Sequence, residues 1–93
     1  MYKKALITIQ NKVQAGNIYI TEHAEEELIA ERFFVEDVIK GILSGKIVER
    51  QADELTIEWK YKIVGNSTQI HRKISVIVVN RKDAVVITVF EEI

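Results

Sequence analysis

Residues 35–50 read VEDVIKGILSGKIVER, and within this stretch the spacing of the apolar residues changes from helical to alternating. Before Gly45, apolar side chains recur at i, i+3, i+4, i+7 and i+8, which predicts an amphipathic helix over residues 35–44. Gly45 is a typical helix terminator, and the alternation that follows is typical of strands. The pattern therefore divides the chain into a mainly helical part, residues 1–45, and a sheet part, residues 46–93.

The helical part contains two further periodic segments. Apolar residues at helical spacing predict an amphipathic helix over residues 2–14, with Gly16 as its stop. Residues 18–21 are β-branched and aromatic, which indicates a short extended segment. Thr21 can then cap a second helix that runs through Arg32.

The sheet part contains four alternating or continuously apolar runs. We expect strands at residues 46–50, 57–63, 70–79 and 84–90. The first is an edge strand, and residues 76–79 and 85–89 are apolar almost throughout, which indicates strands near the centre of the sheet. Residues 65–68 and 80–83 are connections too short for anything but antiparallel neighbours. The predicted fold is α+β, with N-terminal helices packed on a C-terminal four-stranded antiparallel sheet.

Length and composition limit the classes of protein that fit. A chain of 93 residues with 47% hydrophobic and 29% charged residues predicts a single globular domain, residues 1–93, with one modest core. The absence of cysteine excludes disulfides, thiolate zinc sites and cysteine nucleophiles. The first ten residues are too short and too polar a stretch for a signal peptide or a membrane span, so we expect a cytoplasmic protein without membrane contact.

Charge is unevenly distributed along the chain. Residues 1–54 contain seven Lys/Arg and ten Asp/Glu (−3), whereas residues 55–93 contain six and four (+2), which together give the net charge of −1. This balance argues against strong nonspecific binding of nucleic acid, which depends on neutralising many phosphates. A locally basic sheet face can nevertheless guide a short RNA, and the alternative is a surface of solvated charges.

His23 is the first candidate for chemistry. It lies in the first turn of the helix after Thr21, where the helix dipole favours the neutral imidazole and the neighbouring glutamates favour the protonated form. The alternative is a structural histidine that caps the helix or packs under the sheet.

Arg32 is the second candidate, nine residues later. It could hold a phosphate, but it shares a face with His23 only if the helix ends early or bends. The alternative for Arg32 is an ion pair with a nearby glutamate or an interaction with the dipole at the helix C-terminus.

A set of basic residues in the sheet part could bind single-stranded RNA: Lys60, Lys62, His71, Arg72 and Lys73. If residues 70–79 form one strand, His71 and Lys73 share one face and Arg72 lies on the other. Trp59 and Tyr61 could stack on bases, but they alternate in phase with the apolar residues of their strand, so core packing is the alternative.

The sequence lacks a close His/His or Cys pattern, a phosphate-binding glycine loop, a nucleophile elbow and a dinucleotide fingerprint. We therefore expect no metal and no cofactor.

Five short motifs occur in one order along the chain: Ile20–Glu25, Glu31-Arg32, Val35–Val38, Ser44–Glu49 and Val86–Phe90. From about residue 18 to residue 91 they resemble the family of domains of unknown function called DUF4258. That family is similar to the RelE and BrnT ribonuclease toxins, whose fold sets an N-terminal helical part against a curved antiparallel sheet. The resemblance implies that His23, Arg32 and Thr88 occupy signature positions. The chain departs from the pattern at Phe33-Phe34, where Gly and an apolar residue are usual, and at Phe90, where Tyr is common and would supply a hydroxyl.

Two functions from different classes are consistent with these observations. The first is a metal-independent endoribonuclease of the toxin type, in which the RNA 2′-hydroxyl attacks the adjacent phosphate. His23 would act as base or acid and Arg32, with Arg72 or Lys73, would hold the phosphate; the partners would be RNA and an antitoxin. The second is a noncatalytic interaction module that binds another protein, or a second copy of itself, through an edge strand, with His23 and Arg32 fixing helix to sheet.

Overall fold

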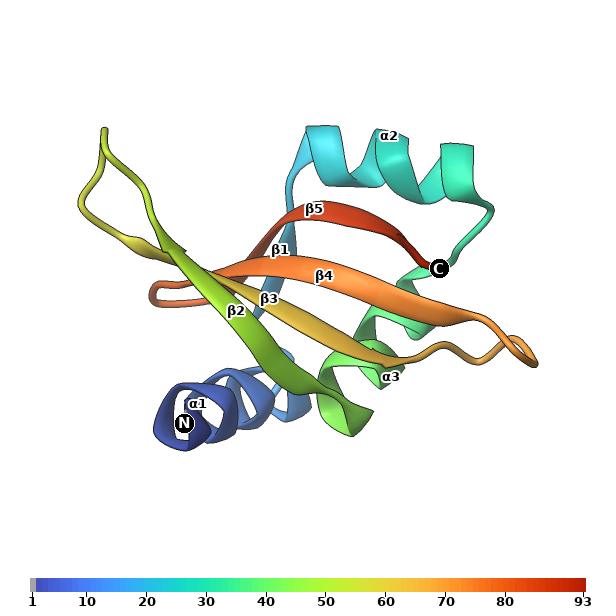
Figure 1. The fold of residues 1–93 in the computed structure, drawn as a ribbon, viewed down its shortest axis with the longest axis horizontal. Coiled ribbons are helices and arrows are strands. Elements are labelled where there is room, and N and C mark those ends of the chain that lie inside the picture. The colour runs from blue at the N-terminus through green and yellow to red at the C-terminus, as the bar shows by residue number, and fades with distance from the viewer. Residues whose placement is uncertain (1) are drawn as a thin grey trace.

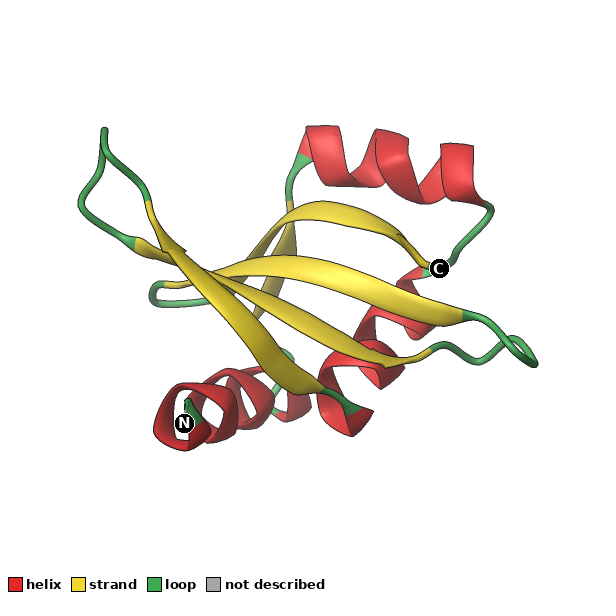
Figure 2. Ribbon diagram, in the orientation of Figure 1, coloured by secondary structure: helices red, strands yellow, loops and turns green. Residues whose placement is uncertain are grey.

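The computed structural model describes residues 2–93, which form three helices and a five-stranded sheet (Figure 1). The elements in chain order are α1 Lys3–Gln14, β1 Ile18–Ile20, α2 Glu22–Glu31, α3 Val35–Ser44, β2 Lys46–Ala52, β3 Trp59–Asn66, β4 Lys73–Asn80 and β5 Ala84–Glu92. The predicted α+β class and the three predicted helices are confirmed, and Figure 2 shows the helices on two sides of the sheet. None of these helices has the length and apolar character needed to cross a membrane.

The sheet is mixed, so the prediction of four antiparallel strands was wrong. Its strand order is β1-β5-β4-β3-β2. The extended segment predicted at residues 18–21 becomes β1 and pairs in parallel with β5, with Ile18 beside Ala84 and Ile20 beside Val86. The other three pairings are antiparallel, as predicted. Because β1 and β5 come from opposite ends of the chain, no local pattern could reveal their pairing.

The hairpin ends also differ from the prediction. Ile57 has φ +59° and is exposed, so β3 begins only at Trp59. Gly65 was predicted to start a turn, but it lies inside β3, and the turn occupies residues 67–72 instead. His71, predicted within a strand, has φ +63° in that turn. The left-handed backbone at Ile57 and His71 ends the alternating strand pattern that the neighbouring residues predict.

One face of the sheet, here called the inner face, packs against α1 and α3. Ile63, Val76 and Val89 are paired across β3, β4 and β5, and all three are fully buried. The helices contribute buried residues such as Ile9 from α1 and Ile42 from α3 to the same core. Figure 1 shows these two helices together on one side of the sheet. β4 and β5 are central strands, as their continuous apolar runs predicted.

Glycines allow α3 to lie directly on the sheet backbone. A Cβ added to Gly65 in β3 would come within 2.0 Å of the carbonyl oxygen of Gly41 in α3. A Cβ added to Gly41 would come within 2.4 Å of a methyl group of Ile74 in β4. Both distances are far below normal contact, so any larger residue at either position would push α3 away from the sheet.

The third helix, α2, covers the edge of β5 beyond the end of β1. The Glu27 carboxylate accepts the N–H of Val89 at 3.2 Å, and the Glu31 carboxylate accepts the N–H of Glu91 at 3.4 Å. These N–H groups alternate along β5 and would otherwise be unpaired edge donors. Thr21 caps the helix, as predicted, by accepting the N–H of Ala24. The i, i+4 spacing of two glutamates thus fits the two-residue repeat of a strand edge.

Candidate functional site

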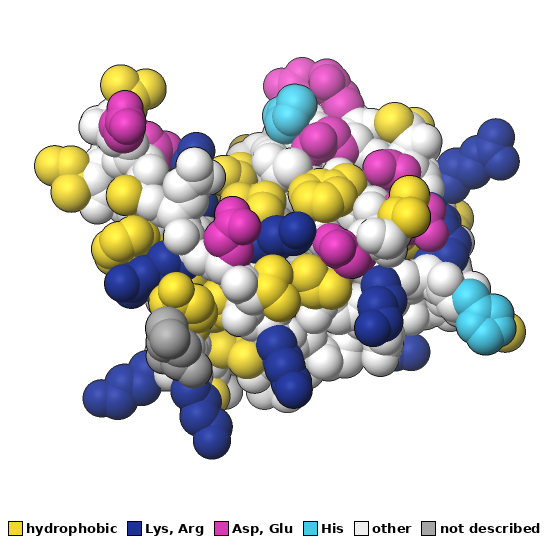
Figure 3. Space-filling view, viewed as in Figure 1, with side chains coloured by type: hydrophobic (Ala, Val, Ile, Leu, Met, Phe, Trp, Pro, Cys, Tyr) yellow, Lys and Arg dark blue, Asp and Glu magenta, His cyan; other side chains and the backbone are white. Residues whose placement is uncertain are grey.

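Four of the predicted substrate-binding residues share the face of the sheet opposite α1 and α3, here called the outer face. Lys62 is paired with Ile77 and Ile77 with Thr88, whereas the neighbours Ile63, Val76 and Val89 point inward. Because side chains alternate along a strand, Lys60 projects with Lys62. The two other members are placed by the register: Thr88 is opposite Ile77, and Lys73 is opposite Asn66 and Glu92. In Figure 3, basic and acidic side chains lie among apolar ones over the middle of the molecule.

The central lysines of the outer face are paired with carboxylates. The Nζ of Lys62 lies 3.3 Å from the carboxylate of Glu92 and 5.4 Å from the centre of the Phe90 ring. The hydroxyl of the buried Ser75 also donates to Glu92, and donation from Ser75 and then Lys62 lowers the pKa of that carboxyl. Lys60 lies 3.4 Å from Asp53 in the β2–β3 hairpin. An anionic ligand would have to compete with these partners.

His23 and Glu27 form a pair on α2 at the β5 edge of this face. The Nε2 of His23 is 3.4 Å from the Oε1 of Glu27, and the His23 side chain is 70% exposed. The same Glu27 oxygen accepts the N–H of Val89, the chain neighbour of Thr88. An imidazole and a carboxylate within this distance can serve as an acid and a base for a substrate in the adjacent solvent.

Arg32 does not lie beside His23. α2 continues to Glu31, so a separation of nine positions in sequence places the two Cα atoms about 13 Å apart along the helix axis. Arg32 adopts φ +59° at the end of the helix, and its carbonyl accepts the side-chain amide of Gln69 at 3.0 Å. Its own side chain is exposed. The structure therefore separates the two residues that the sequence placed in one catalytic set.

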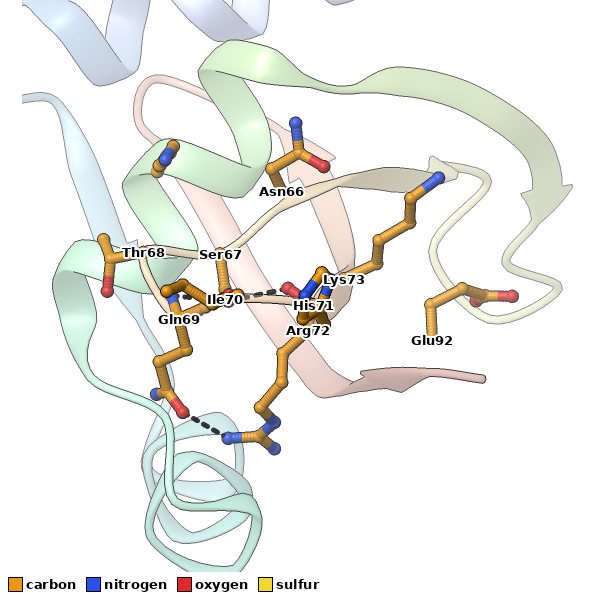
Figure 4. Close-up of a pocket in the computed structure, with 10 residues that line it drawn as sticks. Asn66, Ser67, Thr68, Gln69, Ile70, His71, Arg72, Lys73 and Glu92 are labelled. Atoms are coloured by element: carbon orange, nitrogen blue, oxygen red, sulfur yellow. Dashed lines mark hydrogen bonds between the residues drawn. The ribbon is translucent and has the colours of Figure 1, made fainter.

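Arg72 was predicted to bind phosphate, but its guanidinium donors face protein groups. They donate to the carbonyl of Glu31 at 2.8 Å, to the side-chain oxygen of Gln69 at 2.7 Å and to the carboxylate of Glu91 at 3.0 Å. The guanidinium also lies 4.0 Å from the centre of the Phe33 ring. The hydrogen bond to Glu91 raises the pKa of Arg72. Arg72 thus ties the end of α2 to the 67–72 turn and to β5, as the bond to Gln69 in Figure 4 illustrates.

The family model described as Domain of unknown function (DUF4258) matches residues 20–91. The chain belongs to this family. The resemblance drawn from the five motifs is thereby confirmed for the family itself. No curated protein and no solved structure matches the chain.

Asp37, the main polar anchor of this DUF4258 domain, was not among the residues predicted from the sequence. This carboxylate in the first turn of α3 is buried and accepts the N–H of Phe34 at 2.7 Å. It also accepts both the N–H and the hydroxyl of Thr68, at 2.8 and 2.6 Å, and the amide of Gln69 at 3.1 Å. Burial alone would raise the pKa of Asp37, but these hydrogen bonds outweigh it and lower the pKa. Only the contact with Phe34 follows from local sequence, as an acidic residue near a helix start.

His71, the remaining basic residue of the predicted set, lies in the β3–β4 turn. A cavity of about 610 Å³ follows this turn, and Figure 4 shows the residues that line it. Its walls include Lys40, His71 and Lys73. His71 is exposed at the turn, and Figure 3 shows the two histidine side chains of the domain far from each other. Within residues 2–93, no group of three His, Asp or Glu residues is placed to hold a metal ion.

Proposed function

We propose that this DUF4258 domain is a metal-independent endoribonuclease of the toxin type, related to the RelE and BrnT toxins, with the outer face as its RNA-binding surface. The observation that supports this is the position of the His23–Glu27 pair at the border of a face that collects Lys60, Lys62, Lys73 and Thr88. An RNA strand lying across this face would place a phosphate near Thr88 and its ribose near the pair.

The chemistry requires one proton to leave the ribose and one to reach the leaving group. A base removes the proton of the 2′-hydroxyl, the 2′-oxygen bonds to phosphorus, and the bond to the 5′-oxygen breaks as an acid protonates that oxygen. Glu27 would act as the base and a protonated His23 as the acid. The products are a 2′,3′-cyclic phosphate and a 5′-hydroxyl.

The cations would bind the phosphates rather than perform proton transfer. Lys60 and Lys62 would exchange Asp53 and Glu92 for phosphate oxygens, which predicts binding that weakens steeply with salt. Arg32, at the far end of α2, would contact a phosphate further along the strand. Arg72 has no part in this chemistry, because protein groups already occupy its donors.

Cleavage of a fluorescent RNA by the purified domain tests the proposal. We expect cleavage in the presence of EDTA, growth arrest on expression, and a loss of rate of about 100-fold or more for His23→Ala and Glu27→Gln. His71→Ala is the matched control, because His71 is also an exposed histidine but lies outside the pair. An inert wild-type protein, or a His23→Ala variant as fast as wild type, would overturn the proposal.

The alternative is a noncatalytic interaction module of the same fold. It is favoured by the ion pairs that engage Lys60 and Lys62 and by the separation of His23 from Arg32. Its partner would be an antitoxin, another protein or a second copy paired through the edge strand β2. In this function His23 is structural, so His23→Ala should lower the melting temperature strongly while the wild-type domain leaves RNA intact. An unchanged melting temperature would count against it.

A further inference from the structure

An apolar groove of about 510 Å³ lies between β1, α2 and the start of α3. Ile18 and Ile20 form its strand side, and Ile29, Phe34 and Val35 form its helix side. Ile29 is 74% exposed and Phe34 is 64% exposed, which is unusual for neighbouring large hydrophobic residues on a small domain. No side chain of the described residues covers them.

The backbone of β1 gives this groove a row of unused hydrogen-bonding groups. In the parallel pairing with β5, the carbonyl of Asn17 accepts from Ala84 and the N–H of Thr21 donates to Val86, so odd-numbered residues face β5. The N–H and C=O groups of Ile18 and Ile20 therefore point away from the sheet. Neither residue makes a side-chain or turn hydrogen bond elsewhere in residues 2–93. This edge can accept one more strand of about three to five residues.

The rim of the groove is acidic at one end. Glu25 lines the groove, and Glu22 and Glu26 lie on the same exposed side of α2 as Ile29 by helical spacing. None of these three carboxylates has an ion-pair partner among the described residues. Arg32 lies at the opposite end of α2, so the negative charge is concentrated at the end where α2 begins.

We propose that this groove binds an extended segment of a partner protein, with apolar residues at alternate positions and Lys or Arg at one end. The alternate apolar side chains would enter the groove while the segment pairs with β1, and its basic end would lie beside Glu22 and Glu25. A second copy of this chain fits less well, because pairing two β1 edges would bring two acidic α2 helices together. The groove lies on the side of α2 away from β5 and is independent of the RNA chemistry.

The test uses a random twelve-residue peptide library displayed on phage and selected on the wild-type domain. We expect enriched peptides with apolar residues at i, i+2 and i+4 and basic residues at one end. Their affinity should fall at least tenfold for Ile29→Glu and for Glu25→Lys. Leu55→Glu is the matched control, because Leu55 is an apolar residue 95% exposed at the tip of the β2–β3 hairpin. His23→Ala should bind the peptides as wild type does.

Hydrogen exchange distinguishes the extended mode of binding from others. A bound peptide should slow exchange at the amides of Ile18 and Ile20, whereas Tyr19 already faces β5. The proposal is overturned by a library without enrichment or by peptides that bind Ile29→Glu and Glu25→Lys as tightly as wild type. Peptides with helical i, i+3, i+4 spacing, or a wild-type dimer that Ile29→Glu dissociates in sedimentation, would also overturn it. Glu25 is exposed, so Glu25→Lys keeps the test valid if Ile29→Glu fails to fold.

Discussion

Replacing Asp37 by Asn tests whether this carboxylate anchors the 67–72 turn to α3. Each of its oxygens accepts two hydrogen bonds: Oδ1 from the N–H and hydroxyl of Thr68, and Oδ2 from Phe34 and Gln69. The amide nitrogen of Asn must take one of these positions: at Oδ2 it faces two N–H donors, and at Oδ1 it faces the N–H of Thr68, whereas the Thr68 hydroxyl can turn and accept from it. At least one hydrogen bond to a charged group, worth about 1.5–3 kcal/mol, is lost outright, and the remaining ones lose their charge assistance, so we expect a total loss of about 3 kcal/mol. That is a large part of the roughly 5–15 kcal/mol typical of a domain.

Urea unfolding at pH 7, followed by circular dichroism, measures this loss. With a slope of about 1–1.5 kcal/mol per molar urea, the midpoint should fall by about 2 M or more. Asp53→Asn is the matched control, because Asp53 also accepts two backbone N–H groups but does so in the exposed β2–β3 hairpin. The control should shift the midpoint far less. A loss below about 1 kcal/mol for Asp37→Asn would refute the reasoning, since it would mean that water satisfies the four donors equally well.

The effect of Asp37 should also depend on pH. Its pKa is lowered in the folded state relative to the roughly 3.9 of an unfolded aspartate, so its contribution is present above about pH 4. It is lost as the pH falls through the folded-state pKa. The difference between wild type and Asp37→Asn should therefore be constant from about pH 5 to pH 8 and shrink below about pH 4. A difference that persists unchanged into strong acid would contradict the assigned charge.

Three further predictions concern how the helices are held on the sheet. Gly65→Ala should destabilise by about 3 kcal/mol in thermal or urea unfolding, whereas Gly16→Ala, in open space at φ +83°, should cost only about 1–2 kcal/mol. Arg72→Lys should lower the melting temperature and speed proteolysis in the 67–72 turn, because an ammonium cannot make the three divergent contacts of the guanidinium. Glu27→Ala should raise the hydrogen-exchange rate of the Val89 amide about fivefold, which NMR can measure, since about 1 kcal/mol of local protection is removed.

Local periodicity predicted the elements that depend on neighbouring residues in the chain. The change from helical to alternating spacing of apolar residues at Gly45 correctly separated α3 from β2. In each element this spacing is set by the side chains that face the core. Thr21 was correctly predicted as a cap because its acceptor lies only three residues away. The family was also identified correctly, since short motifs in a fixed order are themselves local signals.

Apart from the strand ends set by the left-handed residues Ile57 and His71, the failures involve partners that are distant in sequence. The pairing of β1 with β5, the bonds from Thr68 to Asp37 and those from Arg72 to Glu91 join segments that no window of sequence compares. Arg72 was predicted to bind phosphate because a guanidinium suits a phosphate group and the predicted strand offered it no protein partner. The carbonyls at the end of α2, which it binds instead, become visible only in the folded chain.

α2 is the element on which both proposals depend, and its two sides keep them separable. The side facing β5 presents Glu27 to the strand edge and holds His23 beside it, so its geometry is fixed by the sheet. The opposite side presents Ile29 and Glu25 to solvent. Among residues 2–93, no side chain covers Ile29 and no basic side chain forms an ion pair with Glu25. A helix that served only to close the edge of β5 would need the first side alone. The exposed apolar and acidic side therefore requires a separate explanation, and substitutions at His23 and Ile29 can test the two sides one at a time.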